Sequence, residues 1–325
     1  MTTPFPRDES LPQLFEEQAE LTPDNVALNF GGERLTYAAT DRLVRARGAD
    51  LAARGVRPGD RVALLGENSV DFLLALFAIA RLGAVAVPVN HRLAPAEVTH
   101  VLTDSGAGLV LASAAFTDLA ARAGADPRPL ADRPTPADPA PAVRVAGDDP
   151  CVIMYTSGTT GVPKGAVLTH DNMLWNAINV AIAGPGLGGT DVTIAAAPLF
   201  HIGALGLSAL PLIYVGGTVV VVPTFDPPAF VQLMARESVT TQFLVPAMWA
   251  ALARLPALPP LPALRYAISG GAPCPVTVIE HFTSQGWTFT EGFGMTELSP
   301  AALFLDVSDV LTHAGSVGRP FMHVD

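Results

Sequence analysis

The amino-acid sequence predicts an α/β protein in which helices cover both faces of a mostly parallel sheet. The main observation is that short apolar runs alternate with amphipathic stretches along most of the chain, as strands and helices do in such proteins. The composition agrees, because 50% of the 325 residues are hydrophobic and only 15% are charged, which is typical of a compact globular protein. The length leaves room for about two domains and a large core.

The expected strands and helices follow one another in order from residue 61. A buried strand at 61–66 leads through Asn68, a residue suited to cap a helix, into a helix over about 69–82. Later strands are expected at 84–89, 108–113, 151–156, 218–222, 240–245, 264–269 and 287–290, and later helices from about 95, around 228–237 and after 246. Such sheets bind ligands at the carboxyl ends of strands, so the turns that follow these strands are candidate sites.

The charge and the cysteine content exclude several classes of partner. A formal net charge of -11 argues against nucleic acid, although backbone N–H groups and a metal ion can still hold a small phosphate ligand. Cys151 and Cys274 are too few for a disulfide framework and suit a reducing compartment.

Residues 192–225 lack Asp, Glu, Lys and Arg, but prolines and glycines interrupt them, so we expect strand, loop, short buried helix and strand. Without a signal peptide, the sequence predicts a cytoplasmic protein with no stable membrane insertion.

Two further segments are expected to have structural roles only. Residues 127–146 are rich in Pro and Ala and have no apolar periodicity, which predicts an exposed connector. Residues 184–189, GPGLGG, match the spacing GxGxxG, but they follow an expected helix and precede an expected strand. A dinucleotide-binding fingerprint needs the opposite order, so this segment is predicted to be a loop that ends a helix.

The strongest functional signal is a loop between two strands, residues 155–165, YTSGTTGVPKG. Its glycines let the backbone approach a ligand closely, its hydroxyls add donors, and successive N–H groups can cradle an anion. Lys164 is the only lysine in the chain, and its charge can reach terminal phosphate oxygens. The loop is not a Walker A motif, because Pro163 precedes the lysine and Gly165 follows it. The candidate phosphate-binding residues are Thr156, Ser157, Gly158, Thr159, Thr160 and Gly161.

At this loop the sequence resembles the adenylate-forming superfamily, which contains acyl- and aryl-CoA ligases, peptide-synthetase adenylation domains and firefly-type luciferases. TSGTTGxPKG is the signature of that superfamily. Four more stretches match its motifs in the expected order: PLFHIG at 198–203, SGGAP at 269–273, GFGMTE at 292–297 and GSVGRP at 315–320. The resemblance implies a large N-terminal AMP-binding domain over residues 8–325, with two interleaved mostly parallel sheets flanked by helices. It also implies that the closing β-barrel part and the C-terminal lid domain of the family are absent.

The resemblance assigns roles to individual residues. The adenosine side comprises Gly271, Ala272, Pro273, Glu291, Gly292, Phe293, Gly294 and Met295. Thr296 would contact the α-phosphate and Glu297 would help to hold Mg²⁺, which suits a hard cation. His201, Gly270, Met248 and Trp249 would line the pocket for the acid. From the residues alone, simpler interpretations stay open: Thr296 and Glu297 could cap a helix, and the other side chains could belong to the core.

The implied reaction is the activation of a carboxylic acid by MgATP, followed by transfer of the acyl group to coenzyme A. Lys164, Thr296 and His201 would be its catalytic residues, and the acid would be a fatty, aromatic or terpenoid one. An amino acid is not expected, because PLFHIG lacks the Asp that holds the substrate amino group in peptide-synthetase domains. Since no second lysine could replace the one in the family's C-terminal domain, we expect weak or no adenylation by these residues alone. Two alternatives remain open: an acyl-adenylate-binding module, and a ligase that hands the acyl group to a carrier protein. The sequence does not indicate the oligomeric state.

Overall fold

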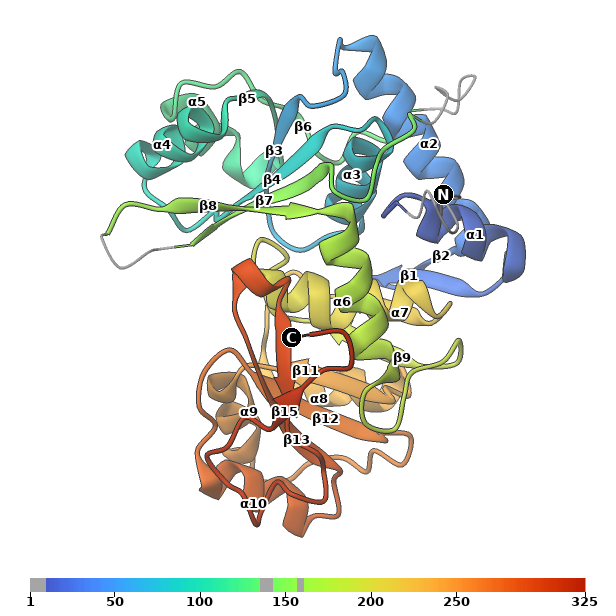
Figure 1. Ribbon diagram of the computed structural model, residues 1–325, viewed down its shortest axis with the longest axis vertical. Helices are drawn as coiled ribbons and strands as arrows, with labels where there is room; N and C mark the ends of the chain where they lie inside the picture. The colour runs from blue at the N-terminus through green and yellow to red at the C-terminus, as the bar shows by residue number, and fades with distance from the viewer. Residues whose placement is uncertain (1–9, 135–142, 157–160, 325) are drawn as a thin grey trace, which may run out of the picture. The chain divides into compact units, whose positions relative to one another are not determined.

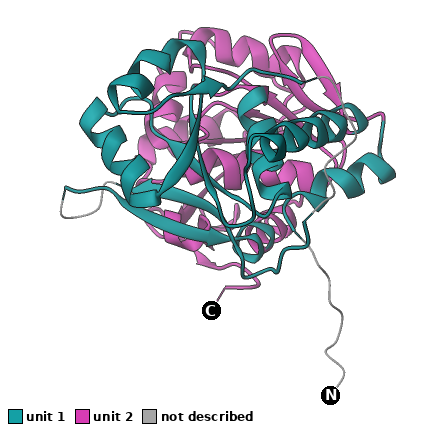
Figure 2. Ribbon diagram, turned by 90° about the horizontal axis from the view of Figure 1, so that it is seen from above, with its two compact units in different colours: residues 1–23, 38–66, 71–174 teal, residues 24–37, 67–70, 175–325 magenta. Residues whose placement is uncertain are grey.

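A computed structural model describes residues 10–134, 143–156 and 161–324 of the chain. The chain divides into two compact units (Figure 2). Unit 1 comprises residues 1–23, 38–66 and 71–174, and unit 2 comprises residues 24–37, 67–70 and 175–325. Ser157, Gly158, Thr159 and Thr160, four of the candidate phosphate-binding residues, lie outside the described residues, as does the 135–142 part of the connector.

Unit 1 contains a six-stranded sheet in the order β6-β5-β3-β4-β7-β8. Its strands are β3 (Arg61–Leu65), β4 (Val85–Val89), β5 (Ala107–Ala112), β6 (Arg128–Pro129), β7 (Pro150–Thr156) and β8 (Lys164–Thr169). Only β8 is antiparallel to its neighbour. The accompanying helices are α1 (Gln13–Leu21), α2 (Tyr37–Ala53), α3 (Val70–Arg81), α4 (Pro95–Ser105) and α5 (Thr117–Arg122). In Figure 1, α4 and α5 lie beside β5, and their apolar side chains pack on this sheet.

Helix α4 shows how the local sequence sets the limits of an element in unit 1. It begins with Pro95, whose fixed φ suits the first helical position, and the Glu97 carboxylate accepts the Ala94 N–H at 2.8 Å. It ends at Gly106, which has φ 65°, a left-handed conformation that favours glycine. These end signals place α4 directly between β4 and β5, as a parallel crossover requires.

Unit 2 contains two sheets. The four-stranded sheet has the order β2-β1-β10-β9 and the five-stranded sheet the order β11-β12-β13-β14-β15. The strands of the first sheet are β1 (Val26–Phe30), β2 (Glu33–Thr36), β9 (Val192–Ala195) and β10 (Thr218–Val221). Those of the second are β11 (Thr241–Leu244), β12 (Tyr266–Gly270), β13 (Phe289–Gly294), β14 (Ala301–Phe304) and β15 (Arg319–Pro320). The helices are α7 (Leu210–Tyr214), α8 (Pro227–Arg236), α9 (Pro246–Ala253) and α10 (Val276–Ser284). Helix α6 (His170–Ile182) is divided between the two units.

The α/β class and most of the expected elements are confirmed, with differences in detail. The described residues form three sheets and not two. The strand expected at 287–290 is β13, which runs from Phe289 to Gly294, so the glycines at 292 and 294 lie inside the strand. The segment 192–225 is strand, turn, helix and strand as expected, and within the described residues no helix is long and apolar enough to cross a membrane.

The role expected for Asn68 as a helix cap is wrong. Its Oδ1 accepts the Leu199 N–H at 2.7 Å, and its Nδ2 donates to Ala195 O at 3.3 Å and Ala197 O at 2.8 Å. The side chain is buried, with 4% of its surface exposed. Asn68 therefore bonds to backbone groups at the end of β9 and directly after it, and not to the first turn of α3.

The two segments expected to be purely structural have different outcomes. The GPGLGG segment does end a helix, since α6 stops at Ile182 and Gly184 and Gly186 both have positive φ. The connector is not exposed throughout its described part. Residues 128–129 form β6, and Leu130 and Val145 are buried. The prediction of an exposed connector is therefore wrong for Leu130 and Val145, whereas residues 128–129 are exposed as expected.

Candidate functional site

The segment that is expected to bind phosphate connects β7 and β8, two paired antiparallel strands of unit 1. Thr156, the last residue of β7, pairs with Lys164, the first residue of β8, so the loop opens and closes at one pair. Lys164 is exposed. Gly161 has φ 80°, a conformation that side chains with a Cβ rarely adopt. The hairpin therefore places Lys164 directly opposite Thr156, another of the residues expected to bind phosphate.

Helix α4 contacts this hairpin at the end next to the loop. His100 Nε2 lies 3.0 Å from Pro163 O, and the Tyr155 hydroxyl donates to Asp104 Oδ2 at 2.7 Å. Burial raises the pKa of Tyr155, and Asp104 raises it further. Gly165 faces Tyr155 across the hairpin, and a Cβ there would lie 3.2 Å from the Tyr155 ring. The backbone next to Lys164 is thus fixed by contacts that the sequence did not reveal.

In unit 2, the expected adenine side lies at the carboxyl ends of two neighbouring parallel strands. β12 and β13 are paired so that Gly270 lies opposite Gly292. A Cβ on Gly270 would lie 3.1 Å from Gly292 O, so glycine permits this approach. Gly271 follows with φ 87°, and Ala272 and Pro273 are exposed. The residues that the family motifs assign to adenosine therefore come together at one edge of a sheet, where α/β proteins bind ligands.

Glu291 lies inside unit 2 and contacts the turn that follows β12. Its side chain is buried, and Oε1 accepts the Cys274 N–H at 3.1 Å. Burial raises the pKa of Glu291, and the Cys274 N–H opposes that rise. Its contact is with the turn that carries residues 271–273, so it orients that turn.

Thr296 and Glu297 lie in a short turn between β13 and β14. The turn is closed at its base because the Met295 N–H donates to Pro300 O at 3.1 Å. Gly294 is required there, since a Cβ would overlap the Pro300 carbonyl. Thr296 to Leu298 form one turn of 3-10 helix in which Glu297 is exposed and Thr296 half-buried. Phe293 and Met295 are also exposed, so the turn presents its side chains outward.

The candidate acid-pocket residues have different environments. His201 is exposed and its ring lies 4.6 Å from that of Phe200. Met248 is half-buried on α9. Trp249 is fully buried, its indole N–H donates to Ile268 O at 3.0 Å, and the rings of Phe282 and Phe289 surround it. We therefore assign Trp249 to the core of unit 2, the simpler of the two sequence interpretations.

The residues also fit a magnesium ion that arrives with a nucleotide. Among the described residues, no group of three or more His, Cys, Asp or Glu side chains could hold a metal by itself. Mg²⁺ usually takes one or two protein carboxylates and completes its shell with phosphate oxygens and water. The single exposed carboxylate of Glu297, on a turn of fixed backbone, suits that arrangement.

The fold and these motifs define an adenylate-forming protein. The AMP-binding enzyme family matches residues 15–325, and the chain belongs to it. A feruloyl-CoA synthase of Amycolatopsis sp. is 41% identical over 324 residues, covering 98% of this chain and 66% of that protein. The long-chain-fatty-acid–CoA ligase FadD13 of Mycobacterium tuberculosis is 37% identical over 307 residues, covering 90% and 61%.

The solved structures agree with this family assignment. The inhibitor-bound N-terminal domain of FACL13 from Mycobacterium tuberculosis superposes with a TM-score of 0.89 at 33% identity, covering 97% of this chain and 83% of that one. The fold of the N-terminal domain is therefore confirmed. The chain spans about two thirds of the length of the curated relatives it matches, 66% for the synthase named above.

The structure also places two residues next to the candidate site that the sequence analysis did not identify. Asn176 on α6 and Phe243 on β11 both contact backbone next to the candidate site residues of unit 2. An asparagine in an amphipathic helix and a phenylalanine in an apolar strand carry no signal of their own. Only their non-local partners distinguish them.

Proposed function

We propose that this chain activates a carboxylic acid with MgATP, forming an acyl-adenylate and pyrophosphate, and that the acyl group then passes to the thiol of coenzyme A. The observation that carries the proposal is the gathering of residues 270–273 and 292–297 at the carboxyl ends of adjacent parallel strands in an AMP-binding enzyme. The names of the relatives, which are CoA ligases and synthases, support the same reaction class.

The proposed chemistry needs positioning and charge neutralisation but no protein nucleophile. A carboxylate oxygen of the acid attacks the α-phosphorus, and the bond to the pyrophosphate oxygen breaks. In unit 2, the Thr296 hydroxyl donates to an α-phosphate oxygen. In unit 1, the Lys164 ammonium provides positive charge for a phosphate group of the nucleotide. Mg²⁺, when bound through Glu297, neutralises phosphate charge. His201 orients the acid next to the reacting phosphate.

We further propose that the acid is aromatic. The Phe243 ring lies between the backbone of Gly203, two residues after His201, and that of Gly270, the last residue of β12. A Cβ on Gly203 or Gly270 would be 3.2 Å or 3.3 Å from the ring. A phenylalanine in this place limits the depth available to a long chain next to Gly270. The relative with the name feruloyl-CoA synthase points in the same direction.

A thermal-shift titration tests the proposal. The probes are non-hydrolysable acyl-adenylate analogues with cinnamoyl, dodecanoyl or acetyl groups, and AMP is the reference. Ligand at 100 times its Kd stabilises the fold by about 2.7 kcal/mol, so binding is readily seen. We expect the largest shift with the cinnamoyl analogue, and we expect Lys164→Ala and Glu297→Ala to weaken the binding of MgATP.

Arg122→Ala serves as the control, since Arg122 is an exposed residue that pairs with Asp118 on α5. It should bind MgATP as the wild type does. A wild-type protein that no analogue stabilises would contradict the proposed adenylation. Transfer is tested separately by offering coenzyme A and a carrier-protein thiol to the preformed adenylate, and faster transfer to the carrier protein would contradict CoA as the acceptor.

We also place the protein in the cytoplasm. Cys151 and Cys274 are both buried and unpaired, which is consistent with a reducing compartment. Burial raises the pKa of the Cys151 thiol to about 12, so this thiol is protonated and unreactive.

A further inference from the structure

A proline leaves one backbone carbonyl of unit 2 without its helical partner. Residues Ala204–Ala209 form a π-helix, in which a carbonyl accepts from the N–H five residues later. The Leu210 N–H does donate to Leu205 O in this way. The next carbonyl, that of Gly206, would need the N–H of residue 211, which is a proline and has none. Since an unpaired buried carbonyl is costly, Gly206 O requires a donor from elsewhere.

Asn176 supplies that donor and uses its other amide atom on a second backbone group. Its Nδ2 donates to Gly206 O at 2.7 Å, and its Oδ1 accepts the Ala301 N–H at 3.0 Å. Both hydrogen bonds are buried, and 4% of the Asn176 surface is exposed. One side chain thus joins the π-helix to the first residue of β14.

The two backbone segments are also in direct contact at Gly206. A Cβ on this glycine would overlap Pro300 Cδ and would lie 3.1 Å from Ser299 O. Pro300 is the residue whose carbonyl closes the turn that carries Thr296 and Glu297. The helical segment begins at Ile202, directly after His201. Asn176 therefore lies at the junction between the segment that follows His201 and the turn at 295–301.

We propose that Asn176 is a positioning residue of the adenylate site, which fixes the Thr296–Glu297 turn against the helix that follows His201. This inference rests on the proposed function for its catalytic meaning. A neutral amide is needed, because the junction requires one donor and one acceptor in a buried place. Leucine has a similar volume and offers neither.

Asn179 provides a matched control on the same helix. It lies three residues further along α6, 3% of its surface is exposed, and its Oδ1 accepts the His323 N–H at 3.3 Å. Asn176→Leu and Asn179→Leu each remove one buried amide of equal size. Only the first removes contacts to the turn at 295–301. If Asn176→Leu does not fold, the smaller change Asn176→Ser replaces it, since serine is too short to span both partners.

Two measurements on the full chain test the inference. In the ligand-free protein, Asn176→Leu should raise hydrogen exchange of peptides covering 204–210 and 295–301, whereas Asn179→Leu should raise it near residue 323. With the cinnamoyl-adenylate analogue, Asn176→Leu should raise Kd at least tenfold, and Asn179→Leu should leave Kd within twofold of the wild type.

Different measurements distinguish a failure of this inference from a failure of the proposed function. Unchanged exchange at 295–301 in Asn176→Leu overturns the inference, and so does an equal loss of affinity in both variants, because that result indicates a general loss of packing. A wild-type protein that binds no adenylate analogue overturns the proposed function instead.

Discussion

At the scale of single residues, His170 is a buried histidine that the chain keeps uncharged. It is fully buried at the start of α6, where its Nδ1 accepts the Leu11 N–H at 3.2 Å. Nδ1 is therefore unprotonated and the proton lies on Nε2, for which the described part of the chain provides no partner. Burial lowers the pKa of His170 to about 4, and the nearby charge of Asp149 opposes this only in part.

His170 should make the protein less stable in mild acid. The unfolded chain takes up this proton near pH 6.5 and the folded chain only near pH 4, so the unfolded state binds more protons between these values. The free energy of unfolding should therefore fall by about 2 kcal/mol from pH 7 to pH 5. Urea unfolding at both values measures this. His170→Asn should flatten the dependence, and His313→Asn, a change at an exposed histidine, should not. An equal slope in His170→Asn and wild type would refute this assignment.

Phe243 should determine the length of acid that the proposed site accepts. Phe243→Ala removes the ring that fills the space between Gly203 and Gly270. If residue 270 borders the acid, as the family motif implies, the variant should bind the dodecanoyl-adenylate analogue about tenfold better relative to the cinnamoyl analogue. The lost ring should also cost about 3 kcal/mol of stability, so Phe243→Leu provides a milder test. Unchanged relative affinities in a folded variant would remove Phe243 from the pocket.

At the scale of elements, one carboxylate organises the starts of three strands in unit 2. Asp191 directly precedes β9, accepts the Gly188 N–H at 2.8 Å and the Thr240 hydroxyl at 2.6 Å, and binds Arg265 at 2.7 Å. Thr240 directly precedes β11, and Arg265 directly precedes β12. Burial opposes ionisation of Asp191, but the hydrogen bonds and the charge of Arg265 outweigh it and lower the pKa. The glycine-rich loop at 184–189 is thus held by a structural anchor.

Asp191→Asn should destabilise unit 2 without touching the candidate site. An amide cannot accept all of these hydrogen bonds, and we expect a loss of about 2 kcal/mol, reduced by the partial exposure of Arg265. The ionised Asp191 carboxylate adds to the free energy of unfolding above pH 3.8. This stabilisation is lost as the pH falls through the lowered pKa of the folded state. Asp126→Asn, which breaks an exposed pair with Arg128, should cost less than about 0.5 kcal/mol. Equal losses of unfolding free energy in the two variants would contradict the anchor.

Elements with a strong local sequence signal could be predicted from the sequence, whereas those that depend on distant contacts could not. The strands that correspond to β3, β4, β10 and β11 were predicted because they are continuous apolar runs with turn residues beside them. The extension of β13 through two glycines was missed, since glycine carries no strand signal and only pairing with β12 and β14 makes it a strand. The π-helix was not predicted, because the donor to Gly206 O comes from Asn176, which is 30 residues away in the sequence. Asn68 was misread for the same reason: its distant partners outweigh its local preference.

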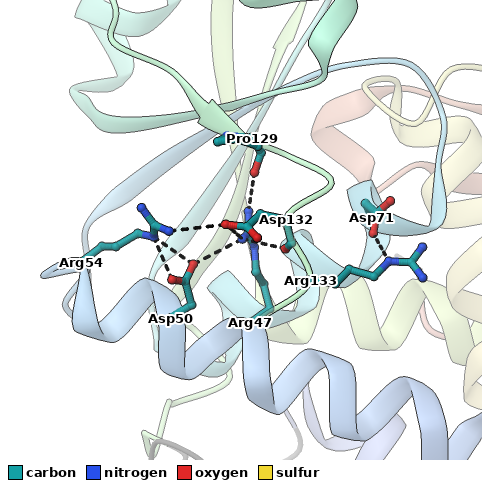
Figure 3. Close-up of polar contacts among 7 residues, drawn as sticks. All are labelled: Arg47, Asp50, Arg54, Asp71, Pro129, Asp132 and Arg133. Atoms are coloured by element: carbon teal, nitrogen blue, oxygen red, sulfur yellow. Dashed lines mark hydrogen bonds and ion pairs between the residues drawn. The ribbon is translucent and has the colours of Figure 1, made fainter. Parts of the chain in front are cut away.

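At the scale of the whole molecule, the network around Arg47 lies entirely within unit 1 (Figure 3). The Arg47 side chain is nearly buried on α2, and it donates to Pro129 O and Asp132 O at 2.9 Å each. Burial lowers the pKa of Arg47, while Asp50 and Asp132 raise it. Arg54 also binds Asp50, and Arg133 binds Asp71 nearby. Residues 129–132 are therefore tied to α2 by partly buried charge-assisted hydrogen bonds, just as Asp191 ties the strands of unit 2.

Arg47→Met should loosen unit 1 alone. It keeps apolar volume but removes the charged donor of two partly buried hydrogen bonds, to Pro129 O and Asp132 O, which should cost about 2 kcal/mol. Hydrogen exchange should then rise in peptides from α2 and from residues 128–134, whereas Asp191→Asn should raise exchange in peptides covering 186–192, 240 and 265. Because the two networks share no residue, the double variant should show additive losses within about 0.5 kcal/mol. If either variant raised exchange throughout both units, the chain would unfold as one cooperative body, and the effects of substitutions in either unit would have to be interpreted on the stability of the whole chain.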